Sequence, residues 1–466
     1  MKKPTLLLWL CLCIGLACQP TPPTQPTQPT LNEEDLEMVT AIFEEALVNG
    51  QAYEWLEHLC LNIGPRLSGS ENAAKAIEWT KSIMEDEGFD QVFLQDVMVP
   101  HWERGAAEEA RLMPSGTTLS VLALGGSPAT PEGGIQAPVV MVTSLEEVDE
   151  LGEQVKGKIV FYNRPFNQRH IQTGPGYGST VDQRSQGAMR ASQYGAVGIV
   201  IRSVSSAFDD VPHTGAQFLV DSIPHIPAAA LGVQSADKLA NALANNPDTE
   251  LFLKMSCQWF DDAPSHNVVG ELKGSEFPEK YIVVGGHLDS WDVGHGAHDD
   301  GSGCMQSIDV LYLMKKLGIQ PRHTIRAVMF INEENGTRGG EKYADLAIEN
   351  KEDHLIAIES DAGAFSPRGF GVSGVEDATL EKMRAWLPLF PQSTVSFINK
   401  GGGGVDIGPL HRRTATPMSG LSVDSQRNFD YHHSPNDTFD KVNRRELHLG
   451  SAALASFIYL IDKYGL

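Results

Sequence analysis

Residues Tyr281–Gly303 read YIVVGGHLDSWDVGHGAHDDGSG. An apolar, β-rich run opens this stretch and two glycines follow it, a pattern that is typical of a buried strand ending in a turn. Histidines and aspartates come directly after the glycines. Burying so many imidazoles and carboxylates together costs free energy unless they pair with one another or bind a cation. The stretch therefore predicts a metal site at the end of a strand.

Two further apolar runs lead into acidic residues: Ile325–Ile331 precedes Glu333–Glu334, and His354–Ile358 precedes Glu359–Asp361. Between the apolar run that opens at Tyr281 and the run Ile325–Ile331, the segment Gly303–Leu317 has apolar residues at helical spacing and a basic pair before a glycine, which predicts a helix. A strand, a helix and a second strand form a parallel crossover unit, and open parallel sheets place their sites beyond the carboxyl ends of the strands. We expect an α/β fold in which a mixed, largely parallel sheet lies between helices.

A fourth segment, Tyr431–Asp440, reads YHHSPNDTFD and places two histidines before a Ser-Pro-Asn-Asp turn. With the three strand ends, it indicates two divalent ions that share one carboxylate, with a histidine on each ion and a spare carboxylate to handle a water proton. Zinc suits this mixed set of nitrogen and oxygen ligands better than magnesium or calcium, which prefer oxygen alone.

These motifs resemble those of the co-catalytic dizinc exopeptidases, the family that includes bacterial leucyl aminopeptidases and glutamate carboxypeptidase. The likeness is greatest to the plasma glutamate carboxypeptidase branch, also called carboxypeptidase Q. It rests on five motifs in family order and on a glycine-rich loop: His287–Ser290, Gly296–Gly303, Glu333–Glu334, Glu359–Asp361, the segment from His433 to Thr438, and Gly401–Leu410.

The resemblance implies two zinc ions per subunit that share one aspartate. The implied ligands are His287, Asp299, Glu334, Asp361 and His433, of which Asp299 is the bridge. His287 and Asp361 would complete one site, and the other two ligands the second. The resemblance also implies a cis peptide bond between Asp299 and Asp300.

Two more residues receive catalytic roles from the resemblance. Glu333 would be the general base, and Asp289 would orient the imidazole of His287. His432 stands where some relatives carry a tyrosine that steadies the oxyanion, which makes His432 a candidate for contact with the substrate or the oxyanion. The family match does not use His295 or His298, which we interpret as loop or rim residues.

The expected activity is hydrolysis of terminal peptide bonds in small peptides. The motifs do not separate an aminopeptidase from a carboxypeptidase or dipeptidase. The alternatives are a hydrolase of non-peptide amides on the same dizinc site, a catalytically inactive binding protein of the same fold, and a glutaminyl cyclase with one zinc ion. Family resemblance also favours a homodimer.

The N-terminal residues have the composition of an export signal. Residues 1–18 carry two lysines and a short apolar run, which predicts a signal peptide, and residues 19–31 form a Pro/Thr/Gln-rich linker. Cys18 stands where a bacterial lipoprotein would be acylated; a plain cleaved signal is the alternative. We expect an exported protein that is periplasmic, secreted or an outer-membrane lipoprotein, with membrane contact only through that anchor.

Net charge limits the classes of partner, and cysteine content limits the number of disulfides. The chain of 466 residues has a formal net charge of −24, which argues against nucleic acid or an anionic membrane surface as a partner. Three of the 6 cysteines lie in the signal. The remaining three, Cys60, Cys257 and Cys304, allow at most one disulfide.

Residues 32–110 and 258–466 are predicted to form two catalytic parts, and the sequence between them consists of short runs typical of β-strands. We expect residues 111–257 to form an inserted, β-rich protease-associated domain, because Val155–Val160 and Ala191–Ile201 resemble elements of that domain. Its loops Gly174–Gly178 and Asp209–Thr214 either reach the substrate or are surface turns. In the first catalytic part, Asn72–Gly88 predicts a helix that Asn72 caps.

Overall fold

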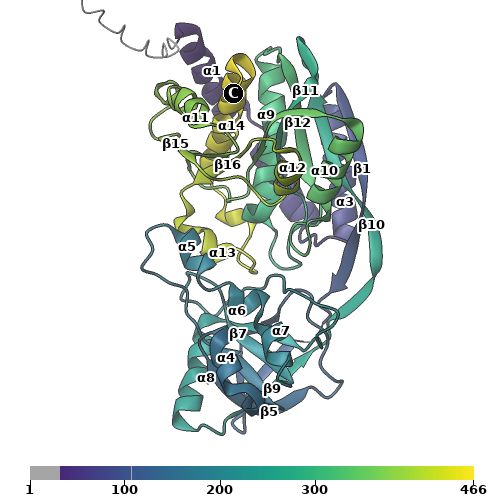
Figure 1. Cartoon of the computed structure of the whole chain (residues 1–466), viewed down its shortest axis with the longest axis vertical. Coiled ribbons are helices and arrows are strands. Elements are labelled where there is room, and N and C mark those ends of the chain that lie inside the picture. The colour runs from purple at the N-terminus through teal and green to yellow at the C-terminus, as the bar shows by residue number, and fades with distance from the viewer. Residues whose placement is uncertain (1–31, 107) are drawn as a thin grey trace, which may run out of the picture. The chain divides into compact units, whose positions relative to one another are not determined.

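Two eight-stranded sheets organise the chain (Figure 1). The structure, a computed structural model, describes residues 32–106 and 108–466. The predicted signal peptide, the linker and Cys18 therefore lie outside the described residues. Within the described ranges, no helix has the length and apolar composition needed to cross a membrane.

The first sheet has the strand order β1-β10-β12-β11-β13-β16-β14-β15. Its four central strands, from β12 to β16, are parallel, and antiparallel strands flank them on both sides. This is the predicted mixed α/β sheet. The strands, in chain order, are β1 Gln91–Glu103, β10 Gln258–Leu272, β11 Phe277–His287, β12 His323–Phe330, β13 Asp353–Glu359, β14 Pro367–Ser373, β15 Phe397–Lys400 and β16 Met418–Val423.

Helices cover both faces of this sheet, because alternate strand residues enter separate cores. In β11, Ile282 and Val284 pack in a core with α9 and α14, whereas Val283 packs in a core with α10 and α12. The helices of this part are α1 Glu33–Asn49, α2 Ala52–His58, α3 Glu71–Asp86, α9 Ser302–Lys316, α10 Arg338–Asn350, α11 Asp377–Arg384, α12 Gly408–Thr414, α13 Asn428–Tyr431 and α14 Arg444–Tyr464.

The cap predicted for α3 was wrong by two residues. The hydroxyl of Ser70 accepts from the backbone N–H of Ala73 and caps the helix. Asn72 lies inside the first turn, and its amide instead donates to the carbonyl oxygens of Ile63 and Pro65.

The second sheet, of strand order β3-β2-β9-β5-β6-β7-β8-β4, is built from residues between β1 and β10. Its strands are β2 Glu108–Met113, β3 Thr117–Leu119, β4 Val121–Ala123, β5 Ile135–Val142, β6 Ile159–Tyr162, β7 Gly198–Arg202, β8 Ala228–Leu231 and β9 Glu250–Met255. Its helices are α4 Leu145–Leu151, α5 Thr173–Gly178, α6 Asp182–Ser185, α7 Gly187–Ser192 and α8 Val233–Asn245.

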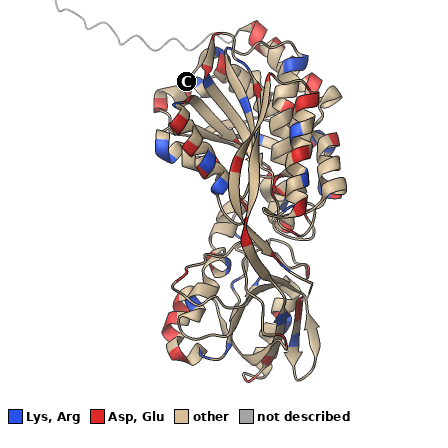
Figure 2. Ribbon diagram, turned by 90° about the vertical axis from the view of Figure 1, so that its right-hand side faces the viewer, with Lys and Arg blue, Asp and Glu red and all other residues tan. Residues whose placement is uncertain are grey.

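A two-stranded ribbon connects the two sheets. β1 and β10 pair antiparallel along almost their whole length, from Gln91 opposite Glu271 to Glu103 opposite Gln258, and Figure 2 shows them passing from one sheet toward the other. Both parts carry acidic and basic residues on their helices (Figure 2). The three described cysteines are buried and free, so no disulfide joins them.

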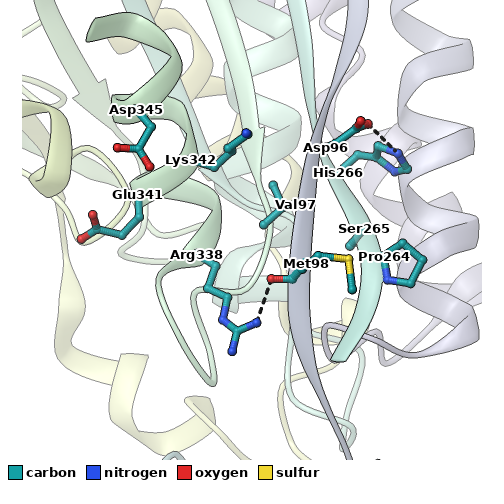
Figure 3. A pocket seen from close by; sticks show the side chains of 10 residues that line it. All are labelled: Asp96, Val97, Met98, Pro264, Ser265, His266, Arg338, Glu341, Lys342 and Asp345. Atoms are coloured by element: carbon teal, nitrogen blue, oxygen red, sulfur yellow. Dashed lines mark hydrogen bonds and ion pairs between the residues drawn. The ribbon is translucent and has the colours of Figure 1, made fainter. Parts of the chain in front are cut away.

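A cavity of about 640 Å³ opens beside this ribbon, between β1, β10 and α10 (Figure 3). Its polar wall contains Arg338, whose guanidinium donates to the carbonyl oxygen of Met98 at 3.0 Å, and a contact of 3.3 Å between Asp96 and His266. None of its lining residues is among the predicted site residues.

Candidate functional site

Three parallel strands deliver their predicted residues to one edge of the first sheet. His287 is the last residue of β11 and pairs with Phe330, the last residue of β12, so the Glu333–Glu334 pair follows beside it. Asp361 comes two residues after β13. Gly286 lets the carboxylate of Asp300 approach the end of β11, because a Cβ at this position would lie 2.2 Å from one of its oxygens. The predicted convergence of strand ends is therefore present.

Asp299 lies at the centre of the predicted ligands. Its Oδ1 is 3.2 Å from Nε2 of His287, and its Oδ2 is 3.3 Å from Nε2 of His433. His287 Nε2 also lies 3.7 Å from an oxygen of Asp361, and His433 Nε2 lies 3.1 Å from Oε2 of Glu334. One aspartate thus separates two histidine–carboxylate pairs, which is the arrangement that a bridging carboxylate requires.

The donor atoms fit a bound cation. Among the described residues, three buried atoms at this centre have no hydrogen-bond partner: His287 Nε2, Asp299 Oδ2 and Glu334 Oε2. Buried polar atoms are normally satisfied, so their clustering calls for a ligand between them. Two triads, one of His287, Asp299 and Asp361 and the other of Asp299, His432 and His433, each have ligand atoms within 4.8 Å of one another. Mixed imidazole and carboxylate donors suit zinc.

The pKa values of these groups reflect crowding of buried charges. Burial opposes protonation of His287, but the carboxylates of Asp299 and Asp361 outweigh it and raise the pKa well above its usual value. Burial also raises the pKa of Asp299, yet the neighbouring histidines, His432 first, lower it well below the ordinary range. Burial and the charge of Asp299 raise the pKa of Glu334 to about 7. Without a cation, the carboxylates compete for protons.

Asp289 contacts a different segment from the one that we expected. The ring of His287 is held through Nδ1 by the backbone carbonyl oxygen of Asp289 at 2.9 Å. The carboxylate of Asp289 instead accepts from the backbone N–H groups of Asn332, Glu333 and Glu334, at 2.7, 3.1 and 3.3 Å. Asp289 therefore fixes the turn that carries the two glutamates, and it orients His287 only through its main chain.

The carboxylate of Glu333 lies near enough to His287 and Asp361 to interact with their charges. The side chain is half-buried, and no described residue forms a hydrogen bond or ion pair with its carboxylate. Burial, together with the charges of Asp361 and Glu334, raises its pKa well above the usual value. Glu334 differs, because its Oε1 accepts from the backbone N–H of Trp291 at 3.2 Å. The adjacent acids are therefore held differently.

The remaining histidines divide into two groups. His432 stacks on His433 with ring centroids 3.6 Å apart, and its Nε2 lies 3.5 Å from Asp299, so it faces the site as expected. His298 stacks against Phe365 at 4.4 Å and accepts from a backbone N–H, and His295 accepts from another backbone N–H. The last two histidines therefore support loops around the site. The peptide bond between Asp299 and Asp300 is cis, as predicted.

Sequence reasoning assigned no role to three residues that hold the site loop. Arg66 is buried and donates to the carbonyl oxygens of Leu288, His295 and Gly296. Asp437 accepts from the backbone N–H groups of His298 and Asp299, and Asp300 accepts from that of His287. Asp437 stands inside the motif from His433 to Thr438 that resembles the family, which was the available signal.

The second sheet also contributes to the site's surroundings. The guanidinium of Arg184 lies 3.2 Å from Nδ1 of His433, and no carboxylate among the described residues pairs with it. Its Nε has no hydrogen-bond partner. The loop Asp209–Thr214 contacts the histidine pair, since the ring of His213 bonds to the carbonyl oxygen of His432.

A cavity of about 230 Å³ lies next to Asp361. Glycines of the predicted loop and the side chains of Met418 and Leu421 line it. The carboxylate of Glu359 accepts from the backbone N–H groups of Val405 and Ile407 and so anchors that loop. The site therefore has an open recess beside one predicted zinc ligand.

Comparisons with known proteins identify the family. The model of Peptidase family M28 matches residues 267–458. Carboxypeptidase Q of Bos taurus and that of Homo sapiens are each 36% identical to this chain over 411 residues, covering 88% of this chain and 85% of each relative. The chain belongs to peptidase family M28. This confirms the predicted zinc metallo-exopeptidase class and its likeness to carboxypeptidase Q.

Solved structures agree with the M28 assignment. The crystal structure of a peptidase M28 precursor from Shewanella amazonensis has a TM-score of 0.86 and 34% identity, over 93% of this chain and 98% of that chain. A zinc aminopeptidase from Bacillus subtilis has a TM-score of 0.64 at 21% identity, over 88% of this chain and 93% of that chain, and shares the fold.

Proposed function

We propose that this M28 peptidase is a dizinc exopeptidase that cleaves small peptides at a terminal bond. The observation that carries the proposal is the central position of Asp299, whose two oxygens face His287 and His433 on opposite sides. In this arrangement His287 and Asp361 would hold one zinc ion, Glu334 and His433 would hold the other, and Asp299 would bind both. His432 faces the same space and is the candidate for contact with the substrate carbonyl.

Bound zinc supplies a Lewis acid that polarises a carbonyl group and lowers the pKa of water. Glu333 accepts the proton of the attacking water at its unpartnered carboxylate and then donates that proton to the departing amine. Asp289 keeps Glu333 in reach by fixing the backbone of the glutamate turn. Glu334 accepts from the N–H of Trp291 and would hold a zinc ion, so one of the two neighbouring acids would bind metal while the other transfers the proton.

Charges around the site favour substrates with a free carboxylate. Arg184 is a buried cation without an acidic partner, and such a group is costly unless an anion binds it. A peptide's terminal carboxylate could form a charge-assisted hydrogen bond with the guanidinium while the scissile carbonyl lies near Asp299. The recess beside Asp361 would then take a side chain on the other side of the scissile bond. We therefore propose a carboxypeptidase or dipeptidase specificity.

The first experiment measures zinc by mass spectrometry in the purified enzyme and then its turnover of three substrates: a free dipeptide, its C-terminal amide and an aminoacyl anilide. Two zinc ions per chain and a clear preference for the free dipeptide are expected. Arg184→Leu should raise KM for the free dipeptide more than KM for its amide. Zinc at one ion or none would contradict the dizinc site. Preference for the anilide would contradict the carboxylate subsite but not the metal site.

Other expectations from the sequence remain proposals. We propose export by a signal in residues 1–18, with Cys18 as the lipid anchor if one is used, and a protease-associated domain formed by the second sheet. The homodimer is proposed from the family resemblance. Neither nucleic acid nor an anionic membrane surface is expected as a partner, because of the acidic net charge.

A further inference from the structure

His433 reaches the site differently from the other predicted zinc ligands. His287 ends a central strand of the first sheet and Glu334 and Asp361 follow two others, whereas His433 follows α13, a helix of only four residues. Its backbone has a φ of 61°, a left-handed conformation that costs a residue with a Cβ roughly 1 kcal/mol. Such a conformation persists only where surrounding contacts fix it.

The contacts come from the loop between β7 and β8 of the second sheet. The ring of His213 lies with Nδ1 2.6 Å from the carbonyl oxygen of His432, so Nδ1 is the donor. The backbone N–H of Thr214 donates to the carbonyl oxygen of His433 at 2.8 Å. These two bonds hold the main-chain carbonyl groups that precede and follow the α-carbon of His433.

The loop itself is fastened to its own sheet. The backbone N–H of His213 donates to the hydroxyl of Ser203 at 2.9 Å, and the hydroxyl of Thr214 donates to the carbonyl oxygen of Ala123 in β4 at 2.8 Å. His213 is buried. The two donors, the ring of His213 and the N–H of Thr214, are therefore held in place by the second sheet.

Helix α13 is anchored in the same sheet. The side chain of Phe429 is buried in a core made otherwise of second-sheet residues, and its ring stacks on Tyr177 with centroids 4.6 Å apart. The hydroxyl of Ser205 donates to the carbonyl oxygen of Phe429 at 2.9 Å. The segment that leads to His433 thus belongs by packing to the second sheet, although it is made after the whole first sheet.

We infer that the second sheet, through the ring of His213, positions His433 as a zinc ligand and so sets the zinc affinity of one half of the site. This rests on the dizinc site proposed above. His213 is a positioning residue, since it touches neither substrate nor metal. Removing a group that orients a metal ligand typically weakens metal binding about 10–100-fold, and here the loss should fall on the Glu334–His433 half alone.

The test compares full-length variants by chelator competition, with zinc per chain measured at graded free zinc concentrations. His213→Ala should bind one zinc ion as tightly as the wild type and the second about 10–100-fold more weakly. His213→Asn, whose side-chain N–H can take the place of Nδ1–H, should restore the second ion. Thr173→Val is the matched control: it removes a bond of 2.9 Å to Ser425 in the same interface without touching the histidine pair.

Hydrogen exchange gives a second readout, because the amides of residues 428–434 should exchange faster in metal-free His213→Ala than in His213→Asn. If His213→Ala does not fold, His213→Gln replaces it with the same expected loss, since its amide reaches the Nε2 position. Wild-type affinity for both ions in His213→Ala would overturn the inference, as would an equal loss in Thr173→Val. A wild-type enzyme with fewer than two ions would instead refute the proposed dizinc site.

Discussion

Replacing Glu333 by glutamine isolates the proton transfer from the rest of the site. The substitution keeps the size of the side chain, and no described residue bonds to the Glu333 carboxylate, so no protein contact is lost. A positioned general base typically contributes roughly 10²–10⁴ in rate, which is about 2.7–5.5 kcal/mol of barrier. We expect kcat for a dipeptide to fall by that factor while two zinc ions remain bound.

The metal-free form provides an independent measure of the same group. The folded state raises the pKa of Glu333 above the value of 4.5 for an unperturbed glutamate. Its contribution to stability is therefore present below pH 4.5 and is lost as the pH rises through the folded-state pKa. Glutamine does not titrate, so metal-free Glu333→Gln should unfold at a higher temperature than the metal-free wild type at pH 8.

Glu334→Gln is the matched control, since it changes the neighbouring acid, whose Oε2 lies 3.1 Å from His433. Glu334→Gln should bind zinc more weakly than the wild type, and its dipeptide turnover should fall because zinc is lost. Zinc content by mass spectrometry and dipeptide turnover, measured on the same preparations, separate the two variants. A fully metallated Glu333→Gln enzyme with near-normal kcat would refute the role of Glu333 as the base.

Three further predictions test other parts of the structure. Asp289→Ala leaves three backbone N–H groups of the glutamate turn without their acceptor and should lower the free energy of unfolding by about 3 kcal/mol; urea denaturation should show a smaller loss in Asp289→Asn, which keeps one acceptor. Gly404→Ala places a Cβ 1.9 Å from the Glu359 carboxylate and should reduce kcat/KM, whereas Gly178→Ala, with nothing within 4 Å of its Cβ, should leave it unchanged. Burial lowers the pKa of His354 to about 4 from 6.5, so its contribution to stability is complete above pH 6.5 and is lost as the pH falls toward 4. In the metal-free enzyme, the contribution of His354 to the free energy of unfolding amounts to about 3 kcal/mol. The free energy of unfolding of His354→Gln, measured by denaturation, should therefore fall less between pH 7 and pH 4.5 than that of the wild type.

The first sheet and its metal-binding edge followed from local patterns in the sequence. Short apolar runs ending in acids fix a parallel strand and its terminal residues within a few positions, and the structure extends the run that begins at Tyr281 back to Phe277 and forward through the two glycines to His287. Three of the five separated motifs then meet because they stand at the ends of parallel strands that share one edge. Predicting that these motifs meet requires the order and direction of the strands, but not the positions of side chains.

The contacts that the sequence did not reveal all depend on three-dimensional packing. The carboxylate of Asp289 bonds to a turn more than forty residues away, and the spacing His-x-Asp does not show whether a side chain or a main-chain oxygen meets the imidazole. Likewise, nothing in the loop around His213 marks it as a support for His433, which is about 220 residues later in the chain. Such long-range pairs have no local periodicity from which to infer them.

The packing of α1 against α14 has a consequence for synthesis. Lys463 forms a bond of 2.6 Å with Asp35, 428 residues away, and Tyr459 contacts the same aspartate. Contacts over such a separation form late, because the cost of closing the chain precedes their gain. The layer of helices over one face of the first sheet is therefore incomplete until α14 has been made. A chain still bound to the ribosome through its last residues would lack this layer.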